Sequence, residues 1–587
     1  MTFKPVRAVL ASLAAAATLA AGFAGTGMAA DTAVSAADLA RKQPLTVTAD
    51  ADISSKTLVA IRLASYTAAQ YALDNGENVI SGYDLADAGY ATAINDAIAK
   101  AGIDTTGTKE QAAAYEKANP MAWVAMNLLD SKDSPWAGQL RNFLDQLKNE
   151  QAIKNAPGTA LTQGSNTKTM TADVDPGIYV ILDRTTEGQA SIAMMNGTGI
   201  NGMTKLMIDN KNTVTLGTID YKVNYVHAPV KSICNGIDKT GDLDLINRCH
   251  PEDAQPSSTE SRGQTWEASI GDKIEYGVQA QVPNWTGYDH YYLALNDTMS
   301  KGLTFNNDAK AYTWAGEHPK EVNIKTVTTP QADGSTIVTF LFAPTSDGSS
   351  DIVADKANYP VYQPIYVTYT ATVNKNAVIG GDGNPNNISM EYSHNPNVAT
   401  DHGTIPGNST KVYVGALAIS KKDANGKALN GAEFNIYKAK DGKADGKALK
   451  FVKTTNGYRL ADPTETSGTT ATVVAGDVDV TGLDGAYVVR ETKSPFGNNI
   501  LPEFIATVTV QQDGDQAGTY TAALTKGDAN QLVVSDNKFT FTVTNCRHFN
   551  EMPKTGAAWL AVYAATGLLL TATGGVLLAR RRMNAAK

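Results

Sequence analysis

The sequence predicts a mainly β protein made of tandem immunoglobulin-like β-sandwich domains, the first of which carries a helical insertion. The chain has 587 residues, several times what one hydrophobic core usually organises, so three or four domains are expected. Beyond about residue 220 it consists of short β-branched and aromatic runs separated by Gly, Asn, Asp and Pro. That pattern is typical of sandwiches and not of α/β folds.

The first domain is expected over residues 31–222. From Leu45 to Tyr66 apolar and polar residues alternate as in a strand. Residues Asp84 to Ala101 and Glu110 to Gln151 are rich in Ala, Leu, Gln and Lys, and their apolar residues recur every three or four positions, which predicts helices. A strand pattern returns at Gly177–Leu182. The helices therefore form an insertion in a sandwich.

Two further domains are expected, a middle domain over residues 223–408 and a last domain over residues 409–551. The polar stretch Gly403 to Thr410, which contains Pro406 and Gly407, predicts the boundary between them. A final strand, Phe539 to Asn545, leads almost directly into a C-terminal segment over residues 552–587.

Composition excludes several classes of function. With 42% hydrophobic and 19% charged residues the chain should fold. A net charge of −9 without a long basic run argues against nucleic acid as a partner. The sequence contains no glycine-rich phosphate loop, no zinc-spaced Cys/His cluster and no nucleophile elbow, so we expect no enzyme, metal or cofactor.

Both ends of the chain carry targeting patterns. Lys4 and Arg7 precede an alanine-rich run that ends at Ala30, which is the layout of a secretory signal peptide over residues 1–30. Ala557 to Ala579 is long and apolar enough to cross a hydrocarbon core of about 30 Å, and three arginines follow it. By itself this tail fits either a membrane anchor or a processing signal.

The residues before the apolar span favour processing. Met552-Pro553-Lys554-Thr555-Gly556 resembles the LPxTG sorting motif of sortase substrates, with Met in place of the usual Leu. The two side chains have similar volume, so a hydrophobic subsite should accept either. The resemblance implies that a sortase cleaves after Thr555, with the precursor held in the membrane, and that the product stays on the cell wall of a Gram-positive bacterium.

Three cysteines follow the expected export signal, namely Cys234, Cys249 and Cys546. Exported thiols can persist as disulfides, and Cys234 and Cys249 are close in sequence. We therefore predict a Cys234–Cys249 bridge, which would contribute roughly 3 kcal/mol in the chain-entropy model. Cys546 is expected to have no partner.

The segment Val412 to Asn545 resembles the B-type repeat of collagen-adhesin-like surface proteins. Ile419–Asp423 matches its opening strand, and Tyr487–Thr492 resembles the pilin E-box. In that family a lysine of the first strand and an asparagine of the last form an intramolecular isopeptide bond, promoted by the E-box glutamate. The resemblance assigns these roles to Lys421, Asn545 and Glu491.

The chemistry of such a bond makes independent demands. The lysine attacks as a neutral amine, so it must be desolvated, and the acid must stay protonated to polarise the amide carbonyl. All three side chains must therefore face the core, in phase with the apolar residues of their strands. They do so in three sets: Leu417, Ile419 and Lys421; Tyr487, Val489 and Glu491; Phe541, Val543 and Asn545. The alternative is an ordinary ion pair between Lys421 and Glu491.

The middle domain resembles the A-type domain of pilin shafts. There the same reasoning assigns Lys239 as the amine, Asp297 as the acid and Asn386 as the acceptor, because each is in phase with apolar neighbours. Two alternatives stay open: the phase could shift to Asn384 or Asn387, and Asp297 could be an exposed turn carboxylate.

A third lysine is expected to have a different role. Val226–Ser232 partly resembles the pilin motif V-x-V-Y-P-K-N, with Lys231 in the lysine position but Pro229 and Val230 in place of Tyr-Pro. We expect Lys231 to remain solvated at the domain junction and to accept the Thr555 carboxyl of the next subunit, with Lys222 as the next candidate. The alternative is a solvated linker lysine without function.

Together these features predict a structural subunit that a sortase polymerises head to tail into a pilus, and that supports adhesion. The expected partners are the sortase, further copies of the chain, peptidoglycan and a host or surface ligand of unknown identity. The rival hypothesis is a monomeric wall-anchored adhesin, which would use the same folds. The choice between them depends on the acceptor lysine.

Overall fold

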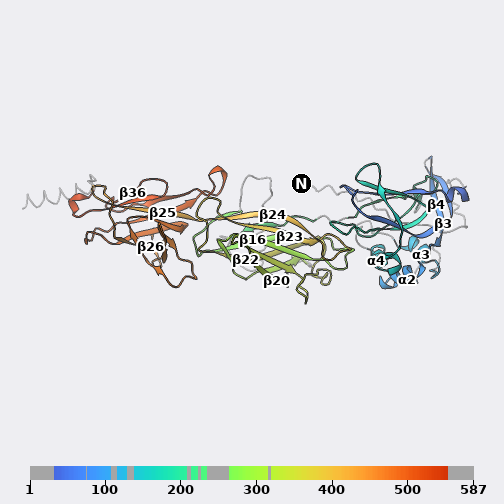
Figure 1. Cartoon of the computed structure of the whole chain (residues 1–587), viewed down its shortest axis with the longest axis horizontal. Coiled ribbons are helices and arrows are strands. Elements are labelled where there is room, and N and C mark those ends of the chain that lie inside the picture. Colours follow the sequence, from blue (N-terminus) through green and yellow to red (C-terminus); the bar gives the residue numbers. More distant parts are fainter. Residues whose placement is uncertain are drawn as a thin grey trace, which may run out of the picture.

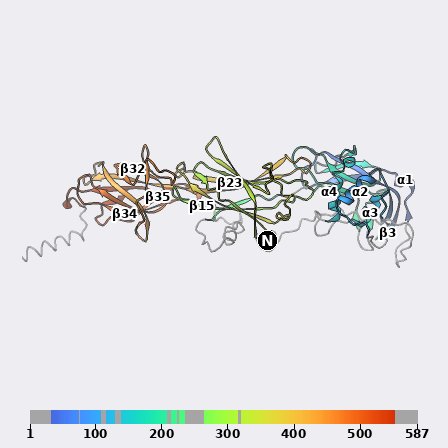
Figure 2. The same cartoon turned by 90° about the horizontal axis from the view of Figure 1, so that it is seen from below.

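The computed structural model describes residues 32–74, 76–106, 115–128, 138–207, 213–222, 226–234, 264–314 and 319–552. The expected signal peptide, Lys239, Cys249 and the sorting residues from Pro553 onward lie outside these ranges. The described chain forms six β-sheets in three successive sandwiches arranged end to end along an elongated molecule (Figures 1 and 2). The predicted mainly β class is confirmed. Among the described residues, no helix has the length and apolar character to span a membrane.

The first sandwich pairs a sheet of order β11-β10-β4-β3-β8-β9, joined by β1 and β5, with a sheet of order β12-β2-β7-β6. Its strands are β1 (Thr32–Ala33), β2 (Gln43–Thr48), β3 (Leu58–Asp74), β4 (Glu77–Asp87), β5 (Thr159–Ala160), β6 (Thr162–Gln163), β7 (Thr169–Val174), β8 (Gly177–Asp183), β9 (Met194–Gly197), β10 (Lys205–Met207), β11 (Thr213–Thr215) and β12 (Thr218–Asp220).

Helices cover the outer face of the larger sheet, beside the strands of that sandwich (Figure 1). They are α2 (Ala91–Lys100), α3 (Pro120–Asn127), α4 (Gln139–Leu147) and α5 (Gln151–Lys154), while α1 (Ala36–Leu39) precedes β2. Strand β8 is buried along its whole length because helices pack on one face and the second sheet on the other. This explains its continuous apolar sequence. The helical pattern expected from Asp84 begins only at Ala91, since Asp84–Asp87 complete β4.

The middle sandwich pairs a sheet of order β13-β15-β22-β18-β19, joined by β17, with one of order β14-β24-β23-β16-β21-β20. Its strands are β13 (Val230–Ile233), β14 (Thr265–Glu267), β15 (Lys273–Gln281), β16 (Leu293–Met299), β17 (Leu303–Phe305), β18 (Lys310–Trp314), β19 (Pro319–Val322), β20 (Ile324–Pro330), β21 (Thr336–Phe342), β22 (Pro364–Val373), β23 (Asn384–Ser393) and β24 (His402–Tyr413).

The stretch Gly403 to Thr410 is not the linker that its composition predicts. It belongs to β24, which pairs with β23 along its length. The register of that pairing shifts between Asn387 and Ser389, and Pro406 lies opposite Ser389. A bulge next to a proline is a common way to keep such a residue in a sheet, because proline has no N–H to donate. Local polarity therefore did not mark the domain boundary here.

The last sandwich pairs a sheet of order β30-β28-β29-β32-β25-β37-β36 with one of order β27-β26-β33-β34-β35, joined by β31. Its strands are β25 (Gly415–Asp423), β26 (Ala432–Lys440), β27 (Lys443–Asp445), β28 (Phe451–Lys453), β29 (Gly457–Leu460), β30 (Thr469–Thr470), β31 (Thr472–Ala475), β32 (Asp477–Leu483), β33 (Gly485–Lys493), β34 (Glu503–Val510), β35 (Tyr520–Lys526), β36 (Val533–Ser535) and β37 (Thr540–Asn545). Two 3₁₀ turns, η2 (Gly514–Gln516) and η3 (Phe549–Glu551), complete it.

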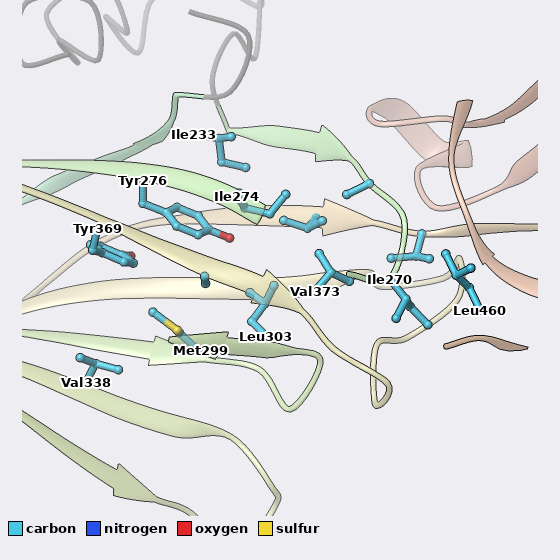
Figure 3. Close-up of a cluster of buried hydrophobic side chains, with 14 of the residues drawn as sticks. Ile233, Ile270, Ile274, Tyr276, Met299, Leu303, Val338, Tyr369, Val373 and Leu460 are labelled. Atoms are coloured by element: carbon cyan, nitrogen blue, oxygen red, sulfur yellow. The ribbon is translucent and has the colours of Figure 1, made fainter. Parts of the chain in front are cut away.

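The two joints between sandwiches differ in chemistry. The middle and last sandwiches share one continuous cluster of buried side chains, in which Ile270 lies beside Leu460 (Figure 3). The contacts between the first and middle sandwiches are mainly polar, since Asn395 Nδ2 donates to the carbonyl of Thr185 at 3.0 Å and Lys148 Nζ donates to that of Gly287 at 2.5 Å.

Candidate crosslinking sites

The middle sandwich brings a lysine, an acid and an amide together in its core. Lys231 comes from β13 in one sheet, whereas Asp297 on β16 and Asn386 on β23 come from the other, and all three are fully buried. Lys231 Nζ lies 2.5 Å from Asp297 Oδ2 and 2.8 Å from Asn386 Oδ1. Asp297 pairs with Ile388, so Asn386 lies diagonally across the two strands.

Two tyrosines that the sequence analysis did not identify complete this site. Tyr276 and Tyr369 stack with ring centroids 5.2 Å apart, and Lys231 Nζ lies 5.6 and 5.8 Å from their rings. Tyr369 donates its hydroxyl to Asp297 Oδ2 and accepts from Asn386 Nδ2 at 3.1 Å. Both rings lie among the buried side chains of this core (Figure 3). In-phase alternation along β15 and β22 was the signal that could have indicated them.

The electrostatics of the middle site favour the reactive protonation states. Burial lowers the pKa of Lys231 to about 8, against the opposing attraction of Asp297. Burial likewise raises the pKa of Asp297, opposed by Lys231. Within the described residues Asp297 Oδ1 has no hydrogen-bond partner. A buried carboxylate with an unsatisfied oxygen is costly, so both pKa shifts move the pair toward the neutral acid and the neutral amine.

The last sandwich holds a second set of the same three groups. Lys421 on β25, Glu491 on β33 and Asn545 on β37 are at most 1% exposed. Lys421 Nζ lies 3.5 Å from Glu491 Oε2, and Asn545 Nδ2 donates to the same oxygen at 3.2 Å. Strands β25 and β37 run parallel, with Lys421 opposite Val543, so Lys421 and Asn545 are diagonal neighbours.

Main-chain carbonyls position this second site. Lys421 Nζ donates to the carbonyl of Val543 at 3.0 Å, and Asn545 Nδ2 also donates to that of Ile500 at 3.2 Å. Burial lowers the pKa of Lys421 to about 8 and raises that of Glu491 to about 7. Glu491 Oε1 and Asn545 Oδ1 are buried without a hydrogen-bond partner in the described chain. A protonated Glu491 facing the amide oxygen would satisfy both atoms.

The structure corrects the prediction for Lys231. Its side chain is fully buried, not solvated, and it takes the place beside Asp297 and Asn386 that the sequence analysis gave to Lys239. A fully buried amine does not meet the condition of exposure on which the predicted role as intermolecular acceptor was based. Lys239 lies outside the described residues. Of the open alternatives, Asn387 is exposed, and Asn384 instead bonds the backbone of Val378 and Val412.

The described residues include only part of the remaining predicted sites. Cys234 is disulfide-bonded and Cys546 is a free, buried thiol. Because Cys249 lies outside the described residues, its pairing with Cys234 stays a prediction. Of the sorting motif only Met552 is described. Among the described residues no cluster of His, Cys, Asp and Glu could hold a metal ion.

Both sites have the components of a self-driven amide exchange. A neutral lysine Nζ can attack the asparagine Cγ while the protonated acid stabilises the developing oxyanion, and the Nδ2 group leaves as ammonia. No external reactant is needed, because one amide is exchanged for another. The geometry thus defines a class of protein: tandem β-sandwiches in which buried Lys, acid and Asn side chains are arranged for internal crosslinking.

Comparisons with known proteins identify the domains. Residues 270–396 match the family described as Gram-positive pilin backbone subunit 2, Cna-B-like domain, and residues 415–526 match the SpaA prealbumin-like fold domain. The middle and last sandwiches therefore each contain a domain of one of these two families. The description of the middle domain is Cna-B-like, whereas its sequence suggested an A-type domain.

Two curated proteins are similar to this chain in sequence. The trypsin-resistant surface T6 protein of Streptococcus pyogenes serotype M6 is 25% identical over 387 residues, which cover 60% of this chain and 61% of the relative. The fimbrial subunit type 2 of Actinomyces naeslundii is 27% identical over 352 residues, covering 53% and 58%. The chain thus spans about 60% of the length of these relatives.

Among solved structures, the T6 backbone pilin of serotype M6 Streptococcus pyogenes aligns with a TM-score of 0.41 and 16% identity, over 86% of this chain and 99% of that one.

Proposed function

We propose that this chain is the repeating shaft subunit of a covalently polymerised pilus, built by a sortase on the surface of a Gram-positive bacterium, and that it supports adhesion as a structural protein and not as an enzyme. The observation that carries the proposal is the pair of fully buried Lys, acid and Asn sets inside domains that match pilin families. Such sets suit a protein that must resist pulling and proteolysis.

In this proposal Lys231 and Asn386 form one isopeptide bond, with Asp297 as the promoting acid. Lys421 and Asn545 form the other, with Glu491 in that role. The short contacts of Lys231 Nζ support the first assignment, and the shared hydrogen bonding of Glu491 supports the second. Each reaction closes a sandwich covalently and releases one ammonia.

The intermolecular acceptor must then be a different lysine, and Lys222 is the next candidate. It follows β12 at the junction of the first and middle sandwiches and is half-buried. Its main-chain N–H donates to Ser191 Oγ at 3.0 Å, and its carbonyl accepts from Ile192 at 3.3 Å, so its backbone is anchored. A junction far from the C-terminus permits head-to-tail growth, which is a contact that does not close and so generates filaments.

The donor in this scheme is Thr555. A sortase would cleave the Met552–Gly556 motif after Thr555, hold the carboxyl as a thioester and transfer it to the lysine of the next subunit. The last subunit of the polymer would be transferred to peptidoglycan. The monomeric wall-anchored adhesin remains the second candidate, and it needs no acceptor lysine.

Denaturing gels of muramidase-released wall material test the proposal. A pilus shaft gives a ladder, and Lys222→Ala should reduce it to monomer while the protein still folds and reaches the wall. Lys411→Ala, on a strand of the middle sandwich, is the matched control and should keep the ladder. A single narrow band from the wild-type chain would favour the monomeric adhesin instead.

A further inference from the structure

The first residue of the sorting motif is not free in the folded subunit. Met552 packs against a small apolar cluster at the end of the last sandwich, formed by Ile500, Leu532 and Cys546. Those three residues are at most 6% exposed, and Met552 is half-buried on them. The cluster is separate from the main core of the sandwich.

The chain between the last strand and Met552 is held down by specific bonds. Asn498 Nδ2 donates to the carbonyls of Cys546 at 2.7 Å and Arg547 at 3.2 Å. Glu551 Oε2 accepts from the N–H of Arg547 at 2.7 Å, which folds the tail back on itself. The turn η3 then closes with a bond from the N–H of Met552 to the carbonyl of Phe549 at 3.2 Å. These bonds make the approach to the motif a defined turn.

This turn conflicts with recognition of the motif. One common way to recognise a peptide motif is to bind it in extended form, with alternate side chains in pockets of the partner. The Met552 side chain cannot fill such a pocket while it packs on the cluster of Ile500, Leu532 and Cys546. Resting on the proposed function, we infer that the segment Asn545–Met552 is a self-docked latch, which withholds the first side chain of the sorting motif from the sortase until the turn opens.

The latch also accounts for the methionine at a position where leucine is usual. Met552 has to fit two apolar sites, the irregular cluster on its own domain and the subsite of the sortase. An unbranched thioether side chain adapts to both more readily than a branched one. The neighbouring Phe549 is 76% exposed and does not contribute to the cluster, so the contact is specific to Met552.

The latch is connected to the crosslinking site. Ile500 contributes its side chain to the cluster and its carbonyl to Asn545 Nδ2. Cys546 directly follows Asn545 in sequence. Ile500 therefore contributes both to the cluster that contacts Met552 and to the position of the Asn545 amide. The latch can form only when the last sandwich is folded.

Cys546 provides a readout, because it is a free, buried thiol in the cluster on which Met552 packs. A thiol reacts as the thiolate, and burial raises the pKa of Cys546, so alkylation requires opening. In the full-length precursor in mild detergent, Met552→Ala should raise the iodoacetamide alkylation rate of Cys546 about tenfold, whereas Met552→Leu and Phe549→Ala should stay near the wild-type rate. A wild-type rate for Met552→Ala would overturn the latch.

The consequence for the sortase is tested with the motif unchanged. Asn498→Ala removes both bonds to the tail, so kcat/KM for sortase cleavage, followed with hydroxylamine as the acceptor, should rise several-fold with the open fraction. An unchanged or lower kcat/KM overturns the inference. If no sortase cleaves the wild-type chain, the proposed function fails, while the alkylation rates still decide whether Met552 is docked.

Discussion

The two crosslinking sites use the same three groups with opposite distributions over the sheets. In the middle sandwich Lys231 stands alone in one sheet, and Asp297 and Asn386 face it from the other. In the last sandwich Lys421 and Asn545 are neighbours within one sheet, and Glu491 reaches across from the other. Burial and convergence of the three side chains are therefore reached with two different strand arrangements.

The difference has a mechanical consequence. A bond from Lys231 to Asn386 would fasten one sheet of the middle sandwich to the other. A bond from Lys421 to Asn545 would fasten the first strand of the last sandwich to its final long strand, beside the tail that carries the sorting motif. The first arrangement prevents the two layers from separating, and the second prevents the end strand from being pulled away.

The largest effect is expected for Lys231→Met, which keeps the volume of the side chain but removes the amine. The variant should regain one ammonia in intact mass and lose about 5 kcal/mol of stability in the middle sandwich, the entropy estimate for a loop of this length. Intact mass and thermal unfolding measure both. Lys222→Met is the control and should keep both bonds. If Lys231→Met still loses two ammonia molecules, the bond belongs to another lysine, with Lys239 tested first.

Glu491→Ala should affect the last sandwich alone. Without the acid the amide is not polarised, so one ammonia is regained and trypsin should cut the last sandwich while the middle one stays intact. The expected loss of stability is again about 5 kcal/mol, from the entropy of the loop that the bond closes. Limited proteolysis followed by mass spectrometry locates the effect. Simultaneous loss of both bonds would show that the sites are coupled through the shared core.

Bond formation in the last sandwich should depend on pH, because it needs a neutral amine and a protonated acid at once. For Lys421, with a pKa of about 8, the neutral amine increases as pH rises; for Glu491, with a pKa of about 7, the protonated acid decreases. Their product is largest between pH 7 and 8 and should fall about tenfold per pH unit on either side. Protein refolded from denaturant over pH 5 to 10, with ammonia loss followed by mass, gives the profile. A rate that climbs steadily to pH 10 would contradict the role of Glu491.

The smallest effect is expected for Tyr369→Phe, which tests the feature that only the middle site has. Losing the hydroxyl removes one donor to Asp297 and one acceptor for Asn386. We expect a several-fold slower middle bond and a loss of about 1 kcal/mol, with the last bond unchanged. Tyr276→Phe is a suitable control, because its hydroxyl has no hydrogen-bond partner among the described residues. Equal slowing by both variants would indicate that ring packing matters more than the hydroxyl.

The site of the last sandwich could be predicted because its three groups lie within long alternating strands. Lys421, Glu491 and Asn545 each continue the apolar phase of their own strand, and the structure buries all three. The middle site could be predicted for Asp297 and Asn386 for the same reason. Lys231 was misassigned, although it shares its phase with Ile233, because β13 is only four residues long. So short a strand is not distinguishable from a linker by pattern alone.

Local alternation along the strands was enough to predict the β class and the inward-facing positions of Asp297, Asn386, Lys421, Glu491 and Asn545, because alternation is a local property of the chain. It could not predict which lysine lies in the middle core, that Gly403–Thr410 is a strand, or that two tyrosines flank Lys231. The tertiary structure also placed Met552 on its own domain. These features depend on contacts between residues far apart in sequence, and their free energy comes from the sheet or core that receives them.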